Sequence, residues 1–455
     1  MICLRLKELE RIVHGKAAAG VNGEITIRGV SIDSRTIREG NLFIPLTRIK
    51  DGHDYAREAI RNGAAAMLWQ SDHPDPPTDV PVIAVEDCLA ALQTLAGDYR
   101  SRLPVKVVGI TGSNGKTTTK DMIDSILSVS YKVHKTKGNL NSQIGLPLTL
   151  LDITPDTEYA VIEMGMSERG QIERLSKLAK PDIAVITMIG VSHLSSLGSR
   201  EQIAAAKMEI VLGMKEGGAL VYNGGEPLLA DAEKAAACRS VRTVRFGTPD
   251  SFGYCAKSIR SDASGVSFQV GGNEYRIPLL GKHNVTNALA SIAVAAIAGI
   301  TSEQCRAGLS KLTVTGMRME ISRSSAGYTV INDAWNASPV SVQAAIETFA
   351  ELEGYSNKFL VLGDMRELGP EERAYHKEIG RLVDPGTIQY VFTIGELARE
   401  IALEAAGRFP TGNVKAFEHK DQIIGELRAV IAPTDAVLIK GSRGLELEHI
   451  AFGLM

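Results

Sequence analysis

The stretch Val105-Lys-Val-Val-Gly-Ile-Thr-Gly-Ser-Asn-Gly-Lys-Thr-Thr118 decides the fold of this chain. Its first residues are mostly apolar and predict a buried parallel strand, and apolar residues at helical spacing from Met122 to Val129 predict a helix after it. A glycine loop between a strand and a helix N-terminus presents backbone N–H groups and partial positive charge to phosphate oxygens. The segment therefore predicts a nucleotide triphosphate site formed by Gly112, Ser113, Asn114, Gly115, Lys116, Thr117 and Thr118.

Two side chains of this loop have expected roles. Lys116 would reach the outer phosphates, and the Thr117 hydroxyl would bind Mg²⁺. The general phosphate-binding loop has a further glycine where this chain has Ile110, and Gly112 lies three residues before Gly115 instead. The alternative is a tight strand-to-helix turn with an exposed lysine, but the flanking strand and helix favour the nucleotide site.

Composition excludes several other classes of protein. The net charge of −3 and the lack of long like-charge runs argue against binding to nucleic acid or to an anionic membrane surface. The N-terminus is charged and helical in pattern, and no apolar run is long enough for a signal peptide core or a membrane span. Five scattered cysteines indicate reduced thiols rather than disulfides or a zinc site. We expect a cytoplasmic protein without membrane insertion.

The 455 residues predict about three domains. We place a small N-terminal α/β domain at 1–103, a central parallel-sheet domain with the phosphate-binding loop at 104–315, and a Rossmann-like domain at 316–455. Strands alternate with helices in the last two domains, which predicts parallel sheets with right-handed crossovers. Two period-two runs around Gly271-Gly272 predict a β-hairpin. The last domain lacks a Gly-x-Gly-x-x-Gly loop, so no dinucleotide site is expected there.

Three residues of the central domain are candidates for metal or phosphate chemistry. Glu163 ends an apolar strand and would face the nucleotide as a Mg²⁺ ligand, although it could be an ordinary strand-terminal glutamate. His193 follows the next strand at the same sheet edge, where it is either a surface residue or a ligand. Lys207 lies in a helix among alanines, and its own surroundings favour a lysine that extends its charge to solvent.

Other polar residues are weaker candidates when each is taken alone. Asn139 and Asn141 are either ligand contacts or turn residues. His283, Asn284 and Asn287 open a helix, and capping would explain one of them. The remaining candidates flank the first strand of the last domain or open the helix after it: Arg318, Asp333, Asn336 and Ser338.

Taken together and in this order, these motifs resemble the Mur ligase family, which builds the peptide stem of peptidoglycan. The resemblance covers essentially the whole chain. Within the family, Asp333-Ala-Trp-Asn-Ala-Ser-Pro339, Leu362-Gly-Asp-Met-Arg-Glu-Leu-Gly369 and Lys440-Gly-Ser-Arg-Gly444 are similar to the member that adds D-alanyl-D-alanine. The Asp-Asn-Pro-Arg motif of the ligase that adds lysine or diaminopimelate is absent near Asn336. The chain departs from its relatives at Gln171, Met188 and Ala334-Trp335.

The resemblance implies an activity. The chain would be an ATP-dependent ligase that joins D-Ala-D-Ala to UDP-MurNAc-tripeptide through an acyl phosphate, with ATP and two Mg²⁺ ions. The first domain would bind the UDP-sugar through Asp33-Ser-Arg35 and the region of Asp51-Gly-His-Asp54. The last domain would bind D-Ala-D-Ala and close on ATP. The expected partners are small molecules, and the expected form is a monomer.

The resemblance also implies residue roles. Thr117 and Glu163 would bind one Mg²⁺, and His193 would bind a second beside Lys207. Because a protonated lysine would repel Mg²⁺, Lys207 would be carbamylated, which replaces the solvent-directed interpretation. Asn284 and Asn287 would contact adenine and ribose, and Arg318 and Asp333 would reach the nucleotide after domain closure. The substrate contacts would come from Ser34, Arg35, Asn139, Asn141, Asn336 and Ser338.

Two other functions stay open. One is a sister ligase that adds a single amino acid, which would be lysine, diaminopimelate or glutamate. The other is a nucleotide-binding regulator without catalysis, against which Lys116, Glu163, His193 and Lys207 argue together.

Overall fold

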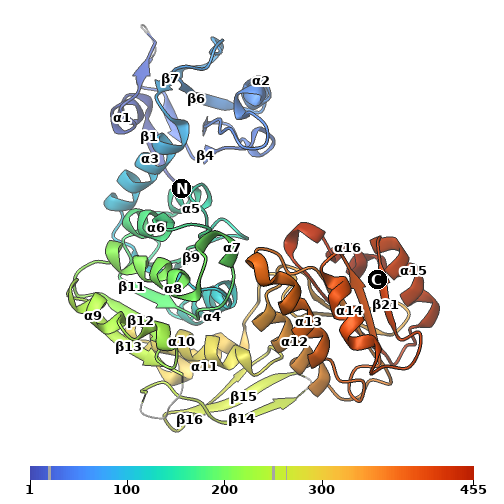
Figure 1. Cartoon of the computed structure of the whole chain (residues 1–455). Helices are drawn as coiled ribbons and strands as arrows, with labels where there is room; N and C mark the ends of the chain where they lie inside the picture. Colours follow the sequence, from blue (N-terminus) through green and yellow to red (C-terminus); the bar gives the residue numbers. More distant parts are fainter. Residues whose placement is uncertain (19–21, 248–251, 263) are drawn as a thin grey trace.

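The computed structural model describes residues 1–18, 22–247, 252–262 and 264–455. Three domains follow one another along the chain, and Figure 1 shows the first above the second, with the third beside the second. All three combine helices with largely parallel sheets, which confirms the predicted fold class.

The N-terminal domain contains a five-stranded sheet in the order β2-β7-β6-β5-β4, in which only β2 runs antiparallel to its neighbour. Its bounds are β2 (Lys16–Ala17), β4 (Val30–Ser31), β5 (Asn41–Phe43), β6 (Ala64–Gln70) and β7 (Val82–Val85), with helices α1 (Leu6–Ile12), α2 (Ala56–Arg61) and α3 (Cys88–Arg102). The helical pattern predicted for the first ten residues is wrong at its start. Leu4 is buried between exposed Cys3 and Arg5, so this alternation forms β1 (Cys3–Arg5), which pairs with β3 (Thr26–Arg28).

The central domain is built on a parallel sheet in the order β13-β12-β11-β8-β10-β9. The strands are β8 (Lys106–Thr111), β9 (Val133–Lys135), β10 (Tyr159–Glu163), β11 (Ile183–Ile186), β12 (Ala219–Asn223) and β13 (Arg242–Phe246). After β8 the chain forms β9 and then β10 on one side of it, and it crosses to the other side for β11. The strand order therefore reverses at the end of β8, which is where open α/β sheets bind ligands.

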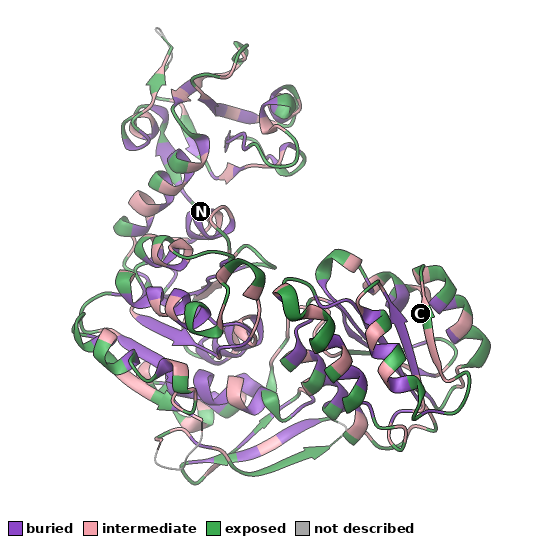
Figure 2. Cartoon of the chain, in the orientation of Figure 1, coloured by how far each residue is buried: buried purple, intermediate pink, exposed green. Residues whose placement is uncertain are grey.

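Helices cover both faces of this sheet: α4 (Lys116–Leu127), α5 (Gly145–Leu151), α6 (Gln171–Ala179), α7 (Leu194–Leu197), α8 (Arg200–Met208), α9 (Ala232–Ala237), α10 (His283–Ile297) and α11 (Ser302–Ser310). Alternate residues of β8 point to opposite faces of the sheet. Val107 packs into a core that continues into the N-terminal domain, whereas Val108 and Ile110 pack with α4 and α10. The first two domains therefore share one core, and Figure 2 shows buried residues running through the sheets.

The predicted hairpin is present as β15 (Gly265–Val270) and β16 (Asn273–Ile277). A third antiparallel strand, β14 (Lys257–Asp262), was not predicted because all six of its residues are exposed and give no apolar alternation. The two edge strands of the central sheet, β9 and β13, were not predicted either, because neither is a run of buried apolar residues.

The C-terminal domain has a six-stranded sheet in the order β17-β18-β22-β19-β20-β21, parallel except for β17. Its elements are β17 (Glu320–Arg323), β18 (Thr329–Asp333), β19 (Lys358–Gly363), β20 (Tyr390–Ile394), β21 (Val414–Phe417) and β22 (Ala436–Lys440), with α12 (Pro339–Glu351), α13 (Glu372–Leu382), α14 (Ala398–Ala406), α15 (Lys420–Val430) and α16 (Glu448–Gly453). This domain has separate cores on the two faces of its sheet.

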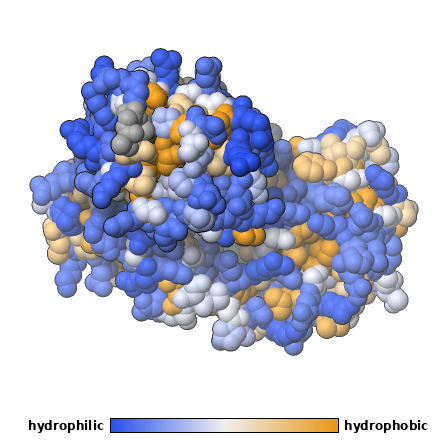
Figure 3. Space-filling model, turned by 90° about the horizontal axis from the view of Figure 1, so that it is seen from above, coloured by the Kyte–Doolittle hydropathy of each residue, from blue (hydrophilic) through white to orange (hydrophobic). Residues whose placement is uncertain are grey.

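The face shown in Figure 3 is largely hydrophilic, with apolar residues in small separate groups. Among the described residues, no helix combines the length and the apolar character needed to cross a bilayer.

Candidate active site

A cavity of about 610 Å³ lies between the central and C-terminal domains. The central domain contributes the loop after β8, the end of β10, the segment after β11, and residues of α8 and α10. The C-terminal domain contributes the ends of β18 and β22 and the start of α12. The carboxyl-end edges of two parallel sheets therefore face one cavity.

The phosphate-binding loop has a backbone that requires its glycines. Gly112 has φ +148° and Gly115 has φ +83°, which are conformations that L side chains rarely adopt. A Cβ at Gly112 would overlap the Thr187 hydroxyl, and a Cβ at Gly115 would overlap the Asn287 amide. The glycine spacing of this loop is thus matched to the side chains packed around it, and α4 begins directly after it at Lys116.

Lys116 is folded over its own loop. Its Nζ donates hydrogen bonds to the carbonyls of Gly112 at 2.7 Å and Ser113 at 3.3 Å. Burial lowers the pKa of Lys116, and the Arg318 guanidinium adds to this effect while Glu163 opposes it. The Nζ atom of Lys116 therefore lies against the phosphate-binding loop, beside the N-terminus of α4.

Thr117 and Glu163 meet at the floor of the cavity. The Thr117 hydroxyl donates to Glu163 Oε2 at 2.9 Å, and the Asn141 amide donates to Glu163 Oε1 at 2.7 Å. The parallel pairing of β10 with β8 sets this contact, because it places Glu163 opposite Ile110 at the strand end. Both Thr117 and Glu163 are buried, so the arrangement concentrates oxygen atoms and one negative charge next to the phosphate-binding loop.

His193 and Lys207 line the same cavity. His193 has φ +63° before α7, and its Nδ1 lies 2.6 Å from Oε2 of Glu367 in the C-terminal domain. Burial lowers the pKa of His193, and the nearby Glu367 carboxylate works in the opposite direction. Nδ1 is therefore engaged, and Nε2 is the nitrogen available to a ligand.

The solvent-directed interpretation of Lys207 is wrong. Its relative exposure is 2%, and no described residue accepts a hydrogen bond from its Nζ. Burial lowers the pKa of Lys207 well below its usual value, and the positive charge of Lys116 adds to this shift. The residue types around Lys207 could not reveal that this face of α8 points into an interdomain cavity.

Arg318 joins the two domains. Its Nη2 donates to the Thr117 hydroxyl at 2.9 Å, and its guanidinium carbon lies 5.9 Å from the Trp335 ring centre. Its buried Nε has no hydrogen-bond partner among the described residues.

Asp333 forms a buried ion pair that the sequence analysis missed. Its Oδ2 lies 2.6 Å from Lys440 Nζ, and its Oδ1 accepts from the Met319 backbone at 3.2 Å. Lys440 ends β22, whose parallel pairing with β18 places it opposite Asp333. Its position after an apolar strand, at the same edge as Asp333, was the available signal.

The two asparagines of α10 form a chain of hydrogen bonds. Asn287 Nδ2 donates to Asn284 Oδ1 at 3.0 Å, and Asn284 Nδ2 donates to the Leu280 carbonyl at 2.8 Å. Neither asparagine caps the helix. The N-cap residue is Lys282, and no side chain accepts a hydrogen bond there from the first turn of α10. The capping alternative is therefore wrong for Asn284 and Asn287, which line the cavity.

The start of α12 also reaches the loop. The Asn114 amide donates to the Ser338 hydroxyl at 3.1 Å, while Ser338 also takes part in a capping box with Ser341. Asn336 lines the cavity, and its carbonyl accepts from Lys440 at 3.0 Å.

Four of the six predicted substrate residues are not among those that line this cavity: Ser34, Arg35, Asn139 and Ser338, which is buried before α12. Ser34 donates to Glu58 at 2.6 Å within the N-terminal domain, and exposed Arg35 pairs with Asp33 at 2.7 Å. Asn139 is exposed and is not among the lining residues, unlike its neighbour Asn141.

Comparisons with known proteins agree with this geometry. Family models match in chain order: the Mur ligase family catalytic domain at residues 26–100, the Mur ligase middle domain at 110–295, and the Mur ligase glutamate ligase domain at 317–443. The chain belongs to the Mur ligase family.

Particular members are similar over the whole length. The UDP-N-acetylmuramoyl-tripeptide–D-alanyl-D-alanine ligase of Bacillus subtilis (strain 168) is 46% identical, over 100% of this chain and 99% of that protein. The crystal structure of MurF from Acinetobacter baumannii superposes with a TM-score of 0.90 at 28% identity, covering 100% and 99% of the two chains. The MurF ligase of Thermotoga maritima in complex with ADP gives a TM-score of 0.79 at 29% identity, covering 94% and 97%.

Proposed function

We propose that this protein is the ATP-dependent ligase that joins D-alanyl-D-alanine to UDP-MurNAc-tripeptide, giving the UDP-MurNAc-pentapeptide for peptidoglycan synthesis. The observation that carries the proposal is the interdomain cavity, where Lys116, Glu163 and Lys207 of the central domain face Arg318 and Asp333 of the C-terminal domain. Full-length similarity to ligases of that name supports the choice of substrates.

The loop fits the triphosphate of ATP. Its backbone curves without Cβ atoms at Gly112 and Gly115, α4 begins at its end, and Lys116 lies over it. Phosphoryl transfer requires mainly positioning and neutralisation of charge, and Lys116 and Arg318 supply two cations for that purpose. Asn284 and Asn287 would contact the nucleoside.

The donor atoms also fit Mg²⁺. The Thr117 hydroxyl and the Glu163 carboxylate offer the hard oxygen ligands that this ion prefers, and they are already 2.9 Å apart. When bound, the ion would neutralise charge on the transferring phosphoryl group. We place a second ion beside His193 and Lys207.

Lys207 fits this second position only in a modified form. An ammonium there would repel a divalent cation, but burial holds the amine toward its neutral state, which is the state that reacts with CO₂. A carbamate on Nζ would turn the buried residue into an oxygen donor with negative charge. We therefore propose that the working enzyme carries carbamylated Lys207.

The reaction would proceed in two balanced steps. An oxygen of the tripeptide's terminal carboxylate attacks the γ-phosphorus of ATP, releasing ADP and forming an acyl phosphate. The amine of D-Ala-D-Ala then attacks the acyl carbon, loses a proton, and the intermediate expels phosphate to leave the amide. Asn336 and Ser338, directly before α12, would position the dipeptide together with Asn141 of the central domain. Closure of the domains would keep water from the acyl phosphate.

The N-terminal domain would bind the UDP-sugar, with Ser34 and Arg35 at its contact surface. Neither residue lines the cavity, which suits a long substrate that spans from the first domain to the reacting carboxylate. We propose that the enzyme works as a monomer in the cytoplasm, where ATP is available.

The test is phosphate release from ATP and UDP-MurNAc-tripeptide with a panel of amines. The proposal expects release with D-Ala-D-Ala far above that with lysine, diaminopimelate or glutamate. Preference for a single amino acid would instead identify a sister ligase. ATP binding without turnover on any amine would identify a nucleotide-binding regulator.

A further inference from the structure

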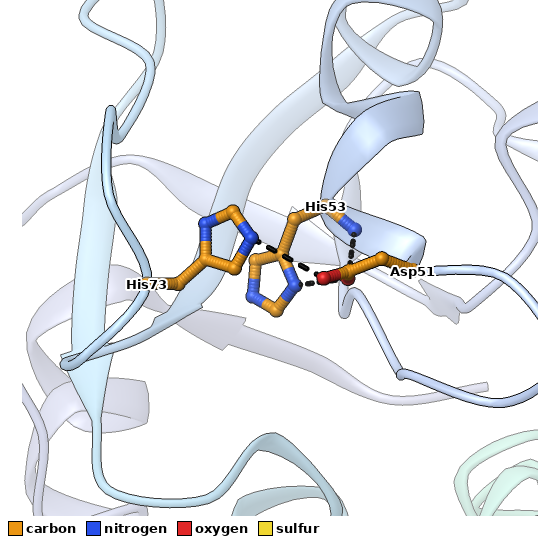
Figure 4. Close-up of side chains that lie close together, drawn as sticks. All are labelled: Asp51, His53 and His73. Atoms are coloured by element: carbon orange, nitrogen blue, oxygen red, sulfur yellow. Dashed lines mark hydrogen bonds and ion pairs between the residues drawn. The ribbon is translucent and has the colours of Figure 1, made fainter.

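Two clusters of charged and titratable side chains lie outside the cavity. The first is Asp51, His53 and His73 in the N-terminal domain, whose side chains lie close together, as Figure 4 shows. The His53 and His73 rings stack at 4.0 Å with 9° between their planes, so their nitrogens cannot converge on one metal ion. The second cluster surrounds Asp121 of α4, beside the segment that joins the central domain to the C-terminal domain.

One face of α4 contacts the chain on its way to the C-terminal domain. Thr117, Asp121 and Ser125 are spaced by four residues, which places them on one side of the helix. Ser125 Oγ donates to the Gly308 carbonyl in α11 at 2.7 Å. At the other end of the face, the Thr117 hydroxyl accepts from Arg318. The chain after α11 therefore runs antiparallel to α4, toward the phosphate-binding loop.

Asp121 makes the middle contact of this face. Its Oδ2 accepts hydrogen bonds from the Thr315 backbone N–H at 2.8 Å and from the Thr315 hydroxyl at 2.9 Å. Thr315 lies between α11 and β17, in the joining segment (residues 311–319) that connects the two domains. Asp121 is 1% exposed, so these hydrogen bonds are shielded from water. One carboxylate thus holds both the backbone and a side chain of the joining segment.

Two lysines balance the buried charge of Asp121. Lys135 Nζ, at the end of β9, lies 3.0 Å from Asp121 Oδ1, and Lys120 Nζ lies 3.5 Å from the same oxygen. Burial alone would raise the pKa of Asp121. The Lys120 charge, the Thr315 N–H and the Lys135 charge outweigh burial, so this pKa is lowered. The carboxylate is therefore ionised, and its hydrogen bonds to Thr315 are charge-assisted.

The residues that flank Arg318 are bound to the C-terminal domain. The Met317 carbonyl accepts from the Trp335 backbone at 3.3 Å. The Met319 N–H donates to Asp333 Oδ1 at 3.2 Å. A single residue therefore separates the contact with α4 from the contacts with the C-terminal domain, and the backbone of Arg318 is set close to both.

We propose that Asp121 is a positioning residue for the Arg318 guanidinium. By holding Thr315 on α4, the carboxylate fixes the point at which the C-terminal domain leaves the central domain, three residues before Arg318. Neither Asp121 nor Thr315 lines the cavity, so their effect on the reaction passes through Arg318. The inference rests on the proposed ligase function, in which Arg318 neutralises charge on the transferring phosphoryl group.

The test compares phosphate release dependent on D-Ala-D-Ala across full-length variants. Asp121→Ala should lower kcat at least about tenfold, with a smaller change in the KM for ATP, because misplacement of a catalytic group by about 1 Å can cost about 10²-fold. The further loss should nearly vanish in an Arg318→Ala background, since both substitutions then remove one interaction. A parental kcat in Asp121→Ala, or losses that multiply in the double variant, would overturn the inference.

Asp124→Ala is the matched control. Asp124 also lies on α4 and pairs with the same Lys135 Nζ, at 2.8 Å, so its variant should disturb the lysine but retain the parental kcat. If circular dichroism shows that Asp121→Ala does not fold, Thr315→Val and Thr315→Ser replace it. Thr315→Val loses the hydroxyl bond to Asp121 and should lower kcat, whereas Thr315→Ser should retain it. Equal kcat values for these two variants would contradict the proposal.

Hydrogen exchange provides a measure that does not require turnover. The Ser195 amide donates to the Glu367 carbonyl at 3.2 Å, which is a second contact between the same two domains. Asp121→Ala should speed exchange in the peptide that contains Ser195, whereas Asp124→Ala should not. A parent protein that releases no phosphate with any amine would refute the ligase function alone. Unchanged exchange at Ser195 in Asp121→Ala would separately overturn the role of Asp121.

Discussion

Arg318 in the C-terminal domain donates a hydrogen bond of 2.9 Å to the hydroxyl of Thr117 in the phosphate-binding loop. The same hydroxyl donates to Glu163, so one threonine connects the guanidinium to the carboxylate at the cavity floor. These contacts couple the position of the C-terminal domain to the proposed nucleotide and metal site.

Removal of this guanidinium should therefore impair chemistry more than folding. We expect Arg318→Ala to lower kcat by about 10²–10³-fold, the usual effect of losing one charge-stabilising donor. Steady-state phosphate release measures the effect. Arg323→Ala, on the exposed side of β17, should retain activity, and equal losses in both variants would contradict the role of Arg318.

The Lys207→Met variant should keep its stability but lose its activity. Because the folded pKa of Lys207 is lowered, the unfolded chain binds more protons below the ordinary lysine pKa, and stability from this residue rises with pH. In bicarbonate-free buffer the variant should be at least as stable as the parent near neutral pH, with the difference shrinking as pH rises. Urea denaturation at several pH values measures it.

The same variant tests the carbamate. We expect a carbamate ¹³C resonance when the parent protein is supplied with ¹³C-bicarbonate, and its loss in Lys207→Met together with ligase activity. The exposed Lys177 provides the control, since Lys177→Met should keep both. Full activity in Lys207→Met would rule out the role.

Glu367 should act through His193. Its carboxylate lies 2.6 Å from Nδ1 and comes from the other domain, so closure would fix the ring with Nε2 toward the cavity. We expect Glu367→Ala to raise the Mg²⁺ concentration for half-maximal activity by about tenfold, the size of effect seen for outer-shell partners. The exposed Glu371 nearby offers the control variant Glu371→Ala, and identical Mg²⁺ curves for all three proteins would refute the idea.

Replacing only one partner of the Asp333–Lys440 ion pair should lower the stability of the C-terminal domain. Lys440→Met leaves a largely buried carboxylate without its partner, and we expect a loss of about 3–5 kcal/mol in the C-terminal domain. Adding Asp333→Asn should recover part of that loss. In a Trp69→Phe background, Trp335 reports the urea transition of this domain, and simple additivity of the two substitutions would argue against coupling.

Local signals in the sequence predicted much of this site. The strand, glycine loop and helix around Gly112 were predictable because all three signals lie within one short segment. Glu163 was predictable because the carboxyl ends of parallel strands share one sheet edge. Edge strands such as β9 and β14 were not predicted, because their residues are half-buried or exposed and so show no apolar pattern.

Contacts between domains could not be predicted from local sequence patterns. Thr117 and Arg318 are 201 residues apart, and only the relative position of two domains brings them together. Lys207 was misjudged from its helix for the same reason, since its burial depends on the cavity that the helix faces. The family resemblance supplied these residues. Lys440 and Glu367 lie within motifs that carried the resemblance, but their contacts with Asp333 and His193 emerged only from the structure.

The most direct test of the central claim uses UDP-MurNAc-tripeptide with ¹⁸O at both oxygens of its terminal carboxylate, together with ATP and D-Ala-D-Ala. If the cavity forms an acyl phosphate and then an amide, mass spectrometry will find one ¹⁸O in each released phosphate and a product extended by two alanines. Phosphate without ¹⁸O, or no extended product, would contradict the account.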